Sequence, residues 1–599
     1  MGRRFFGIRI FVILFLCLIL TYCGGNGGGE APVTKISSFG KYEGYSEPLY
    51  TEFVRSSQYV TVRDGTKLAV DIYRPAIAGN AVDKPYPAIF MFTPYRRAYY
   101  DSQGKLVLSA QRVVDYMTKY GYVIVVGEVR GTGSSFGVRR AMNDRTEAQD
   151  AYDLIEWIAR QPWCDGKVGM YGSSYYGQTV FEALSTMPPH LKAASISVTD
   201  FNKYDGWVRG GIARMSAAIL SPGNVPVDED KDGSMLAAAI AEQKNNGPGL
   251  TADVLKTIPY RDSWDIYSDG YYWIEVSAST YLDEFKRGGV PVYFKGGFYD
   301  FLRRDAFTAF ANWPNPKKLV VGPWRHGEFE ATPEYLIELH RWFDYWLKGI
   351  DNGIMKEPPI YYYTINADPG NEWTLATAWP PERQDVIYFL HGGPSGTVTS
   401  INDGLLKTSA PTSTGQDSFT VVYDIASKVD ILSTEAIPSG KPGTEFDLKG
   451  LTYTSEPLPA DLKVTGHPFV VLWIASDTTD ADVFVILEDV AEDGTSTYVT
   501  DGRLRLSMRA TYEPPYDFLG LPWHRCFKED ERPLTPNTPY RVTIDLMPTS
   551  YVFKKGHRIR IAVNGSQGRL VYFKPDIPYT MTIYREKVRP SYVVLPNPK

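Results

Sequence analysis

Residues 167–177 read KVGMYGSSYYG, and this stretch decides how the chain is expected to fold. An apolar run leads into Gly172, and apolar residues at helical spacing resume after Gly177. The pattern predicts a strand, a sharp turn with Ser174 at its apex, and a helix. A serine on such a strained turn is exposed for nucleophilic attack, and small residues beside it let strand and helix approach each other. The second glycine comes one position later than in the commonest form, G-x-S-x-G, so the motif needs partners elsewhere in the chain.

Short apolar runs alternate with helical segments on both sides of this turn. The runs lie at 87–92, 122–126, 168–171, 193–198, 290–294 and 318–321, and the clearest helical segments at 108–120, 148–160 and 334–347. Such alternation predicts a mostly parallel sheet covered by helices on both faces. Before the first run, residues 59–73 read YVTVRDGTKLAVDIY. The central Asp-Gly predicts a hairpin, so the sheet is expected to open with antiparallel strands.

The remaining segments define the expected domains. Residues 201–287 show helical spacing without strand signals and predict an α-helical cap inserted into the sheet domain, which spans 46–200 and 288–355. Residues 356–599 hold short alternating strands rich in Thr, Tyr and Val, and they predict a linker and a β-sandwich. At the N-terminus, residues 1–22 predict a signal peptide and residues 23–45 a glycine-rich tether and linker.

The N-terminal segment predicts export. Three arginines precede an apolar run, residues 10–20, that is too short to cross a bilayer comfortably. The site resembles a bacterial lipoprotein signal with Cys23 as the lipidated residue, although Tyr22 is larger than is usual there. Ordinary signal cleavage and an uncleaved anchor are the alternatives. The protein is therefore expected in the periplasm or on the cell surface, in contact with a membrane only through an N-terminal lipid.

Charge and cysteine content exclude two further classes of protein. A formal net charge of −6 argues against a nucleic-acid partner, so the expected partner is a small molecule, with homo-oligomer formation left open. Only Cys164 and Cys526 remain beyond the leader, far apart in the sequence. A disulfide framework is not expected, and both are interpreted as packing residues.

A serine hydroxyl needs a base to take its proton and a carboxylate to orient that base. In a sheet of this kind the partners follow later strands, in the chain order serine, acid, histidine. Asp300 is the first carboxylate after the run at 290–294, and His326 follows the run at 318–321. Of the seven histidines, only His326 lies just beyond a strand of the sheet domain. Asp305 is an alternative acid, which its position on the next helix predicts to be solvated.

The reaction also needs hydrogen-bond donors for a developing oxyanion. The backbone N–H of Tyr175, directly after Ser174, is the first expected donor. The loop after the strand at 87–92 reads TPY and lacks the glycine run that would offer a backbone donor. The Tyr95 hydroxyl is therefore the candidate for the second donor.

These motifs resemble the cocaine esterase family, whose relatives include glutaryl acylases, α-amino acid ester hydrolases and X-Pro dipeptidyl-peptidases. The resemblance rests on GSSYYG, TPY, GGFYD and GPWRH, on QPWCDGKVGMYG at 161–172, and on SYVFKKGHRIRIAV at 550–563. It covers nearly the whole chain after the leader. It implies an α/β hydrolase fold with a helical cap and a C-terminal β jelly roll. It also implies Ser174 as nucleophile, His326 as base, Asp300 as orienting acid, and Tyr95 with Tyr175 as the oxyanion hole.

The sequence departs from this family at several positions. The α-amino acid ester hydrolases carry carboxylates that hold the substrate ammonium, whereas the matching positions here are Leu302, Arg303 and Gly177. This argues against amino-acid esters and against aminopeptidase-type recognition. Arg303 and Arg304 suggest instead an acyl group with its own carboxylate, as in a glutaryl acylase; the alternative is two solvated helix arginines. Glu128 replaces the usual aspartate of D-x-R-G, and its role is expected to be structural.

One acidic loop has partial calcium-loop spacing. Asp228, Asp230 and Asp232 precede Gly233 in the D-x-D-x-D-G pattern, but the residue at the twelfth position is Ala239 instead of an acid. A solvated acidic loop is the preferred interpretation. No cofactor is expected.

Together the motifs predict a serine hydrolase that cleaves an ester or amide acyl bond through an acyl-enzyme on Ser174. An X-Pro dipeptidyl-peptidase is the first alternative. A second alternative, of another class, is a surface lipoprotein that binds a polymer through its jelly roll with little catalysis.

Overall fold

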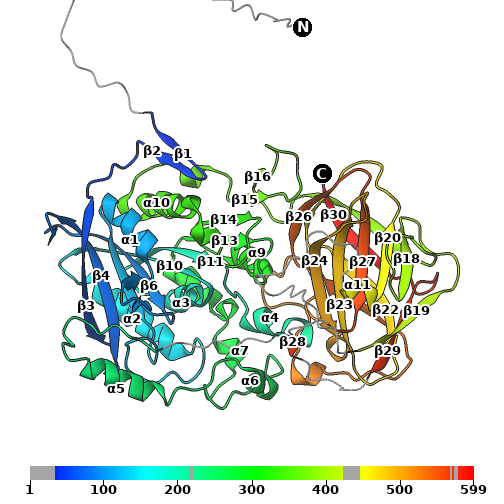
Figure 1. Ribbon diagram of the computed structural model, residues 1–599, viewed down its shortest axis with the longest axis horizontal. Helices are drawn as coiled ribbons and strands as arrows, with labels where there is room; N and C mark the ends of the chain where they lie inside the picture. The colour runs from blue at the N-terminus through cyan, green and yellow to red at the C-terminus, as the bar shows by residue number, and fades with distance from the viewer. Residues whose placement is uncertain (1–33, 215–221, 423–444, 567–569, 572–577) are drawn as a thin grey trace, which may run out of the picture.

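The computed structural model describes residues 34–214, 222–422, 445–566, 570–571 and 578–599 (Figure 1). The predicted signal peptide and Cys23 lie outside these residues. No helix in the described part of the chain is long and apolar enough to cross a membrane.

The first half of the chain forms an eleven-stranded sheet. Seven neighbouring strands, from β9 through β15, run parallel, while β3, β4, β5 and β16 pair antiparallel at the two edges. The predicted opening hairpin is confirmed as β3 and β4. In spatial order the strands are β16 (Trp373–Ala376), β15 (Ile360–Tyr363), β14 (Lys317–Gly322), β13 (Val292–Gly297), β11 (Leu191–Ser197), β10 (Cys164–Ser173), β6 (Tyr86–Thr93), β9 (Val123–Glu128), β4 (Lys67–Ile77) and β3 (Glu52–Thr61), with β5 (Asn80–Ala81) beside β4.

Helices cover both faces of this sheet. On one face, α1 (Gln111–Met117) and α10 (Pro333–Lys348) bury their apolar side chains against alternate strand residues. On the other face, α2 (Arg145–Ala159), α3 (Ser174–Ser185) and α9 (Arg303–Asn312) form a larger core with the intervening residues. Because both faces are buried, the central strands are largely apolar, as expected for a parallel sheet.

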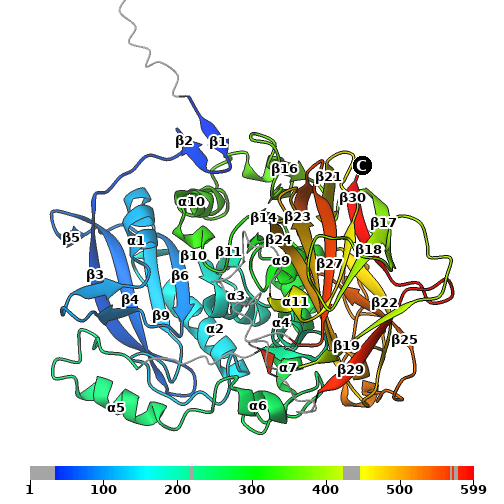
Figure 2. The ribbon, with the colours of Figure 1, turned by 45° about the vertical axis from the view of Figure 1, so that its right-hand side comes forward.

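The insertion between β11 and β13 contains mainly short helices: α4 (Lys203–Trp207), α5 (Ser234–Gln243), α6 (Ala252–Thr257), α7 (Tyr272–Glu275) and α8 (Leu282–Gly288). It also contains a strand that the sequence did not predict, β12 (Ala213–Arg214), which pairs antiparallel with β28 (Leu570–Val571) of the C-terminal half. In Figures 1 and 2, α4, α7 and β28 lie between the two halves of the molecule. The insertion therefore contacts both.

The C-terminal half is β-rich with its own apolar core. Its strands pair antiparallel except for β18 with β20. They are β17 (Arg383–His391), β18 (Asn402–Lys407), β19 (Gln416–Val421), β20 (Leu451–Ser455), β21 (Leu462–Gly466), β22 (Phe469–Ser476), β23 (Asp482–Val490), β24 (Ser496–Arg505), β25 (Tyr540–Asp545), β26 (Thr549–Phe553), β27 (Arg558–Asn564), β29 (Tyr579–Tyr584) and β30 (Tyr592–Pro598). Smaller elements are β1 (Ile36–Ser38) with β2 (Lys41–Glu43), β7 (Ala98–Tyr100) with β8 (Leu106–Leu108), and α11 (Glu445–Leu448).

The first sheet extends beyond its predicted end at residue 355. Strand β15 adds parallel to β14, and β16 turns back antiparallel beside it. Strand β15 is a short, tyrosine-rich run that follows two prolines, and β16 is equally short. Both resemble the β-rich region that comes after them, so composition alone did not separate the two sheets.

Candidate active site

Ser174 lies at the turn between β10 and α3, as predicted. Its φ is +55°, a conformation that is uncommon for a residue other than glycine and that marks backbone strain. Glycines are required on both sides of Ser174 because the backbone there packs closely against neighbouring carbonyl groups. A Cβ on Gly172 would lie 1.9 Å from the Tyr176 carbonyl oxygen, and a Cβ on Gly177 would lie 3.0 Å from the Ser197 carbonyl oxygen. The late second glycine thus lets the start of α3 pack against the end of β11.

The structure brings Ser174, His326 and Asp300 together from the ends of three parallel strands. Ser174 Oγ lies 2.8 Å from His326 Nε2, and His326 Nδ1 lies 2.6 Å from Asp300 Oδ2. The other Asp300 oxygen accepts the Leu302 backbone N–H at 2.6 Å. The Asp300 side chain is 1% exposed and that of His326 18%. The acid is therefore enclosed, while the histidine stays accessible from the pocket side.

The charges around His326 suit a base. Burial alone lowers the pKa of the imidazole, but the Asp300 charge and hydrogen bond outweigh it, so the pKa lies above its ordinary value. A proton on Nδ1 donates to Asp300 and leaves the Nε2 lone pair to accept from the Ser174 hydroxyl. The arrangement can remove a proton from Ser174 and hold it.

Tyr95 and Tyr175 lie where the oxyanion donors were predicted. The Tyr95 ring is 49% exposed, yet its hydroxyl end reaches inward to the Ser174 side chain and the Tyr175 backbone N–H. Burial raises the pKa of this phenol, and those two hydrogen bonds partly offset the rise. The hydroxyl and the N–H therefore converge beside Ser174 Oγ.

Buried polar groups that the sequence did not reveal hold Tyr175. Its hydroxyl donates to Glu147 of α2, with distances of 2.9 and 3.0 Å to the two carboxyl oxygens, and accepts from the Asn143 backbone N–H at 3.2 Å. Burial and the nearby Glu182 raise the pKa of Glu147 well above its ordinary range. The fold therefore favours the protonated form of Glu147 more than water does. No motif marked it, because one acid among several on a helix carries no distinctive pattern.

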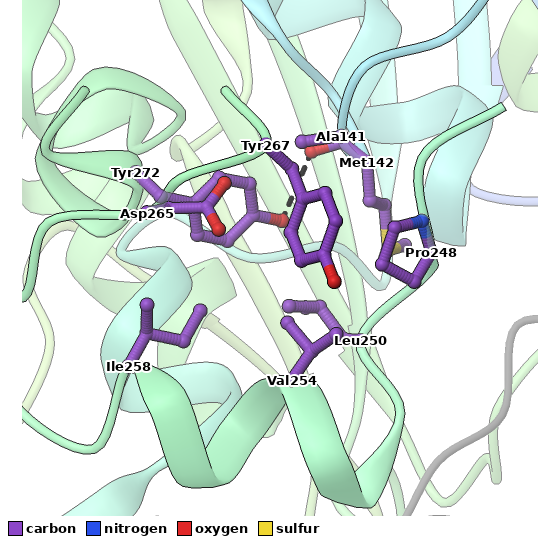
Figure 3. Close-up of a pocket in the computed structure, with 9 residues that line it drawn as sticks. All are labelled: Ala141, Met142, Pro248, Leu250, Val254, Ile258, Asp265, Tyr267 and Tyr272. Carbon is purple, nitrogen blue, oxygen red and sulfur yellow. Dashed lines mark hydrogen bonds between the residues drawn. The ribbon is translucent and has the colours of Figure 1, made fainter. Parts of the chain in front are cut away.

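The insertion contacts the same segment from outside. The Tyr272 hydroxyl on α7 donates to the Met142 carbonyl at 2.9 Å, next to Asn143 (Figure 3). A cavity of about 10 Å³ beside this bond has room for about one water molecule. It is lined by Ala141, Met142, Pro248, Leu250, Val254, Ile258, Asp265, Tyr267 and Tyr272. Helices α6 and α7 are thus packed onto the segment that holds Tyr175.

Two charged residues near His326 were also missed. Arg214 at the end of β12 lies over the Phe301 ring, 3.9 Å from its centroid, and that ring stacks on His326 at 4.7 Å. The Arg214 charge opposes protonation of His326, whereas the Glu330 charge favours it. Both Glu330 carboxyl oxygens are buried without a hydrogen-bond partner among the described residues. Arg214 lies on a two-residue strand and Glu330 on a three-residue 3₁₀ helix, and such short elements show no periodic sequence pattern.

Three predictions about α9 are wrong. Arg303 and Arg304 are not solvated: Arg303 Nη2 donates to Asp501 at 2.9 Å, and Arg304 Nη1 to Asp545 at 2.6 Å. Asp305 is also buried, where it accepts two backbone N–H groups, and burial together with Asp200 raises its pKa to about 7. The C-terminal half covers this helix, which the sequence could not predict. Arg303 and Arg304 are therefore engaged by protein acids.

The carboxylates of the acidic loop at residues 228–232 also accept hydrogen bonds from the protein. Asp228 accepts from the Ser57 N–H and hydroxyl, and the buried Asp230 accepts two N–H groups at the start of α5. Asp232 accepts from Ser234. The preferred interpretation, a solvated loop, is wrong for Asp230. Within the described ranges, no three His, Cys, Asp or Glu side chains are grouped so that they could hold a metal ion.

Two structural predictions are consistent with the structure. Cys164 and Cys526 are both free and buried. Glu128 is fully buried and accepts the backbone N–H groups of Arg97 and Ser134, so it ties the loop after β9 to the loop after β6.

Comparisons with known proteins agree with this geometry. Residues 64–328 match the X-Pro dipeptidyl-peptidase (S15) family, and residues 352–594 match the X-Pro dipeptidyl-peptidase C-terminal non-catalytic domain. A Mycobacterium tuberculosis protein named as a candidate serine esterase is 30% identical over 92% of this chain and 96% of its own. The cocaine esterase of Rhodococcus sp. is 27% identical over 86% and 91%. The crystal structure of a Staphylococcus aureus CocE/NonD family hydrolase matches with a TM-score of 0.70 at 20% identity, over 91% of this chain and 94% of that one.

Proposed function

Because the chain belongs to the X-Pro dipeptidyl-peptidase (S15) family of serine hydrolases, we propose that it hydrolyses a carboxylic ester or amide through an acyl-enzyme on Ser174. The observation that carries the proposal is the continuous hydrogen-bond path from Ser174 Oγ through His326 to Asp300. Three groups from separate strand ends, in this order and at these distances, are what activation of a serine hydroxyl needs.

In the first half-reaction, Ser174 Oγ attacks the substrate carbonyl carbon while His326 Nε2 takes the hydroxyl proton. Asp300 stabilises the imidazolium that results. The oxyanion of the tetrahedral intermediate accepts hydrogen bonds from the Tyr175 N–H and the Tyr95 hydroxyl. The bond to the leaving group then breaks, His326 returns its proton to that group, and an alcohol or amine departs.

In the second half-reaction, water replaces the leaving group. His326 takes a proton from the water as its oxygen adds to the acyl carbon, and the same donors hold the oxyanion. When the ester to Ser174 breaks, the proton returns to Ser174 Oγ and the carboxylic acid leaves. The net reaction adds one water molecule and regenerates the enzyme.

A fluorophosphonate probe tests the proposal. The wild type should be labelled and should cleave a short-acyl 4-nitrophenyl ester, and Ser174→Ala should abolish both. Ser173→Ala, one residue earlier on β10, is the matched control and should keep its labelling. A wild type that neither labels nor cleaves the ester refutes the enzyme proposal, and labelling that persists in Ser174→Ala assigns the nucleophile elsewhere.

An X-Pro dipeptidyl-peptidase is the second candidate, and the buried Glu330 carboxylate near His326 favours it, because a substrate ammonium would pair with that charge. Against it, the positions Leu302, Arg303 and Gly177 offer no acid. This candidate predicts release of 4-nitroaniline from Ala-Pro-4-nitroanilide but not from its N-acetyl form. It also predicts that Glu330→Gln raises KM for the free amine at least roughly tenfold. Equal cleavage of both substrates would exclude it.

We propose in addition that the helices of residues 201–287 act as a cap, that the C-terminal half is a jelly roll, and that export ends in lipid attachment at Cys23. The sequence around Cys23 supports the last point. Metabolic labelling with palmitate should mark the protein, and Cys23→Ser should abolish the label. A wild type that stays unlabelled would exclude the lipid.

A further inference from the structure

A large cavity lies between the insertion and the C-terminal half of the chain. Its volume of about 500 Å³ falls within the range of about 300 to 1,000 Å³ that is typical of small-molecule sites, which are common at interfaces of this kind. Most of its lining comes from the insertion, between residues 202 and 283, and the rest from residues 515–527 of the C-terminal half. None of these described lining residues belongs to the triad or to the proposed oxyanion hole. We call it the interface cavity.

Aromatic rings form much of the wall of the interface cavity. They are the rings of Trp273, Tyr516, Trp523 and Phe527. The Trp273 indole is fixed because its Nε1 donates to the Ile258 carbonyl at 2.9 Å. The Trp523 ring is held against the Arg261 guanidinium, which lies 5.3 Å from the ring centroid. The cavity therefore offers a ligand flat apolar faces whose positions are set by the fold.

The polar part of the lining is mostly uncharged. It consists of the Asn202 amide and the hydroxyl groups of Ser277, Ser279 and Thr280. Ser279 Oγ accepts from Asn202 Nδ2 at 3.1 Å, and Thr280 Oγ1 donates to the Ile274 carbonyl at 2.6 Å. Each of these two hydroxyl groups makes only this hydrogen bond within the described part of the chain. The Ser279 proton and the Thr280 lone pairs thus remain for a ligand.

The charged groups at the interface cavity do not require an ionic ligand. Arg261 is 5% exposed, and it donates to Asp205 at 2.8 Å and to Asn202 Oδ1 at 2.6 Å. Its third nitrogen, Nε, donates to the Arg525 carbonyl at 2.9 Å. Asp283, the acid in the lining, is exposed to solvent. The cavity therefore lacks a buried unpaired charge, which would need a counter-ion.

We propose that the interface cavity binds a neutral carbohydrate. A sugar ring has faces of C–H groups and a rim of hydroxyl groups, so it packs against the aromatic rings while its rim exchanges hydrogen bonds with the hydroxyl and amide lining. An apolar ligand would leave those polar groups without partners, which weakens binding. Because the hydrogen bonds of Arg261 already hold the walls together, little ordering is needed when the sugar enters. This inference concerns a second site and does not depend on the proposed hydrolysis.

Binding of defined saccharides tests the inference. Glucose, galactose, maltotriose, cellotriose, xylotriose and triacetylchitotriose are titrated into the Ser174→Ala variant by calorimetry, so that no turnover contributes heat. At least one should bind with a Kd of about 1 mM or tighter and should raise the Tm of the protein. If no saccharide binds, the proposal is overturned. If indole raises the Tm and no saccharide does, the cavity takes an apolar ligand instead.

The variant Phe527→Ala assigns the binding to the interface cavity. Phe527 is half-buried, so the variant should fold, and the loss of one aromatic face should weaken saccharide binding by roughly tenfold or more. Phe527→Tyr keeps the ring and should bind as tightly as the parent. Phe389→Ala, which removes a half-buried ring of β17, is the matched control and should not change the affinity.

A second variant keeps the test sharp if Phe527→Ala unfolds. Ser279→Ala removes one hydroxyl group and leaves the aromatic walls unchanged, so it should weaken saccharide binding by roughly threefold or more. Unchanged affinity in both variants would place the saccharide elsewhere on the protein and would refute the site.

The ester assay shows whether the interface cavity is separate from the candidate active site. In protein that retains Ser174, Phe527→Ala should keep kcat/KM for 4-nitrophenyl acetate within about twofold while its saccharide affinity falls. Parallel loss of both would make the cavity part of the substrate site and would refute a second site. If the wild type cleaves no ester, the proposed function fails, but the saccharide titrations still test the cavity.

Discussion

At the scale of single residues, the turn at Ser174 requires a glycine at position 172, because there is no room for a Cβ atom there. A Cβ on Gly172 would lie 1.9 Å from the Tyr176 carbonyl oxygen, and neither backbone segment can move without displacing Ser174. Gly172→Ala should therefore destabilise the fold by about 3 kcal/mol or more and abolish fluorophosphonate labelling. Gly288→Ala is the control, because a Cβ there makes only ordinary contacts. Urea unfolding measures both, and a Gly172→Ala variant of wild-type stability would contradict the geometry.

In the proposed mechanism, Tyr95 offers the oxyanion a hydroxyl where related folds often use a backbone amide. Tyr95→Phe keeps the ring against Tyr175 and Tyr176 but removes this donor. We expect kcat to fall on the order of a hundredfold with little change in KM, because the bond strengthens in the transition state. Tyr99→Phe, a nearby ring on β7, should be neutral. A Tyr95→Phe enzyme with unchanged kcat would remove Tyr95 from the oxyanion hole.

The pH dependence should report His326. Burial lowers its pKa, but Asp300 raises it further, so the net shift is upward. Because the base must be neutral, kcat/KM should fall as the pH drops through a value above the ordinary histidine pKa of about 6.5. Removing the nearby cation by Arg214→Met favours the imidazolium, so it should move this acid limb to higher pH. His391→Asn, which changes a half-buried histidine of β17 in the C-terminal half, should not move the acid limb. An acid limb that moves to lower pH in Arg214→Met would refute this electrostatic explanation.

At the scale of helices and strands, the sequence was informative where the chain is regular. Ser174, Asp300 and His326 each follow a strand of one parallel sheet, and the carboxyl ends of such strands share an edge. Their proximity could therefore be predicted. Glu330 lies on a three-residue 3₁₀ helix and Arg214 on a two-residue strand, and the course of such short elements depends on tertiary packing, so nothing in their spacing placed them beside His326.

Helix α2 carries an acid, Glu147, whose pKa the fold raises. Burial and Glu182 raise the pKa of Glu147 well above its ordinary range. The folded state thus binds more protons than the unfolded state above the unfolded pKa, and the stability falls as the pH rises above about 4.5. Glu147→Gln should remove this dependence and raise the free energy of unfolding at pH 8, while Tyr175→Phe should cost about 1–3 kcal/mol. Exposed Glu492→Gln is the control in urea titrations at pH 5 and pH 8. A Glu147→Gln variant that is less stable than the wild type at pH 8 would refute the upward shift of the Glu147 pKa.

At the scale of the whole molecule, the C-terminal half contacts the candidate active site through helix α9. The class of each half, a parallel sheet covered by helices and then a β-rich region, could be predicted, since β-rich and alternating patterns differ in period. The pairing of arginines with acids across the interface between the two halves could not be predicted, because it depends on packing between residues that are hundreds of positions apart in the sequence. Arg303 was interpreted without its partner Asp501 for this reason.

Asp501 of the C-terminal half connects the interface between the two halves to the candidate active site. Arg303 donates to it at 2.9 Å and also to the Asp300 carbonyl at 3.1 Å, while Arg209 donates to the second Asp501 oxygen at 2.8 Å. Burial raises the pKa of Asp501, but these two cations outweigh it and lower the pKa overall. Its contribution to stability is therefore complete above the ordinary aspartate pKa of about 3.9 and is lost as the pH falls through the lower folded value.

Replacing this acid should affect both stability and turnover. Asp501→Asn leaves two buried guanidinium groups without their counter-charge, so the free energy of unfolding at pH 7 should fall by about 3–5 kcal/mol. Because Arg303 also contacts the Asp300 carbonyl, kcat should fall with it, even at temperatures where the variant is fully folded. Asp385→Asn, which breaks an exposed pair with Arg383, should change neither by more than about 0.5 kcal/mol. If Asp501→Asn unfolds more easily yet keeps full kcat when folded, the interface stabilises the fold without positioning Asp300.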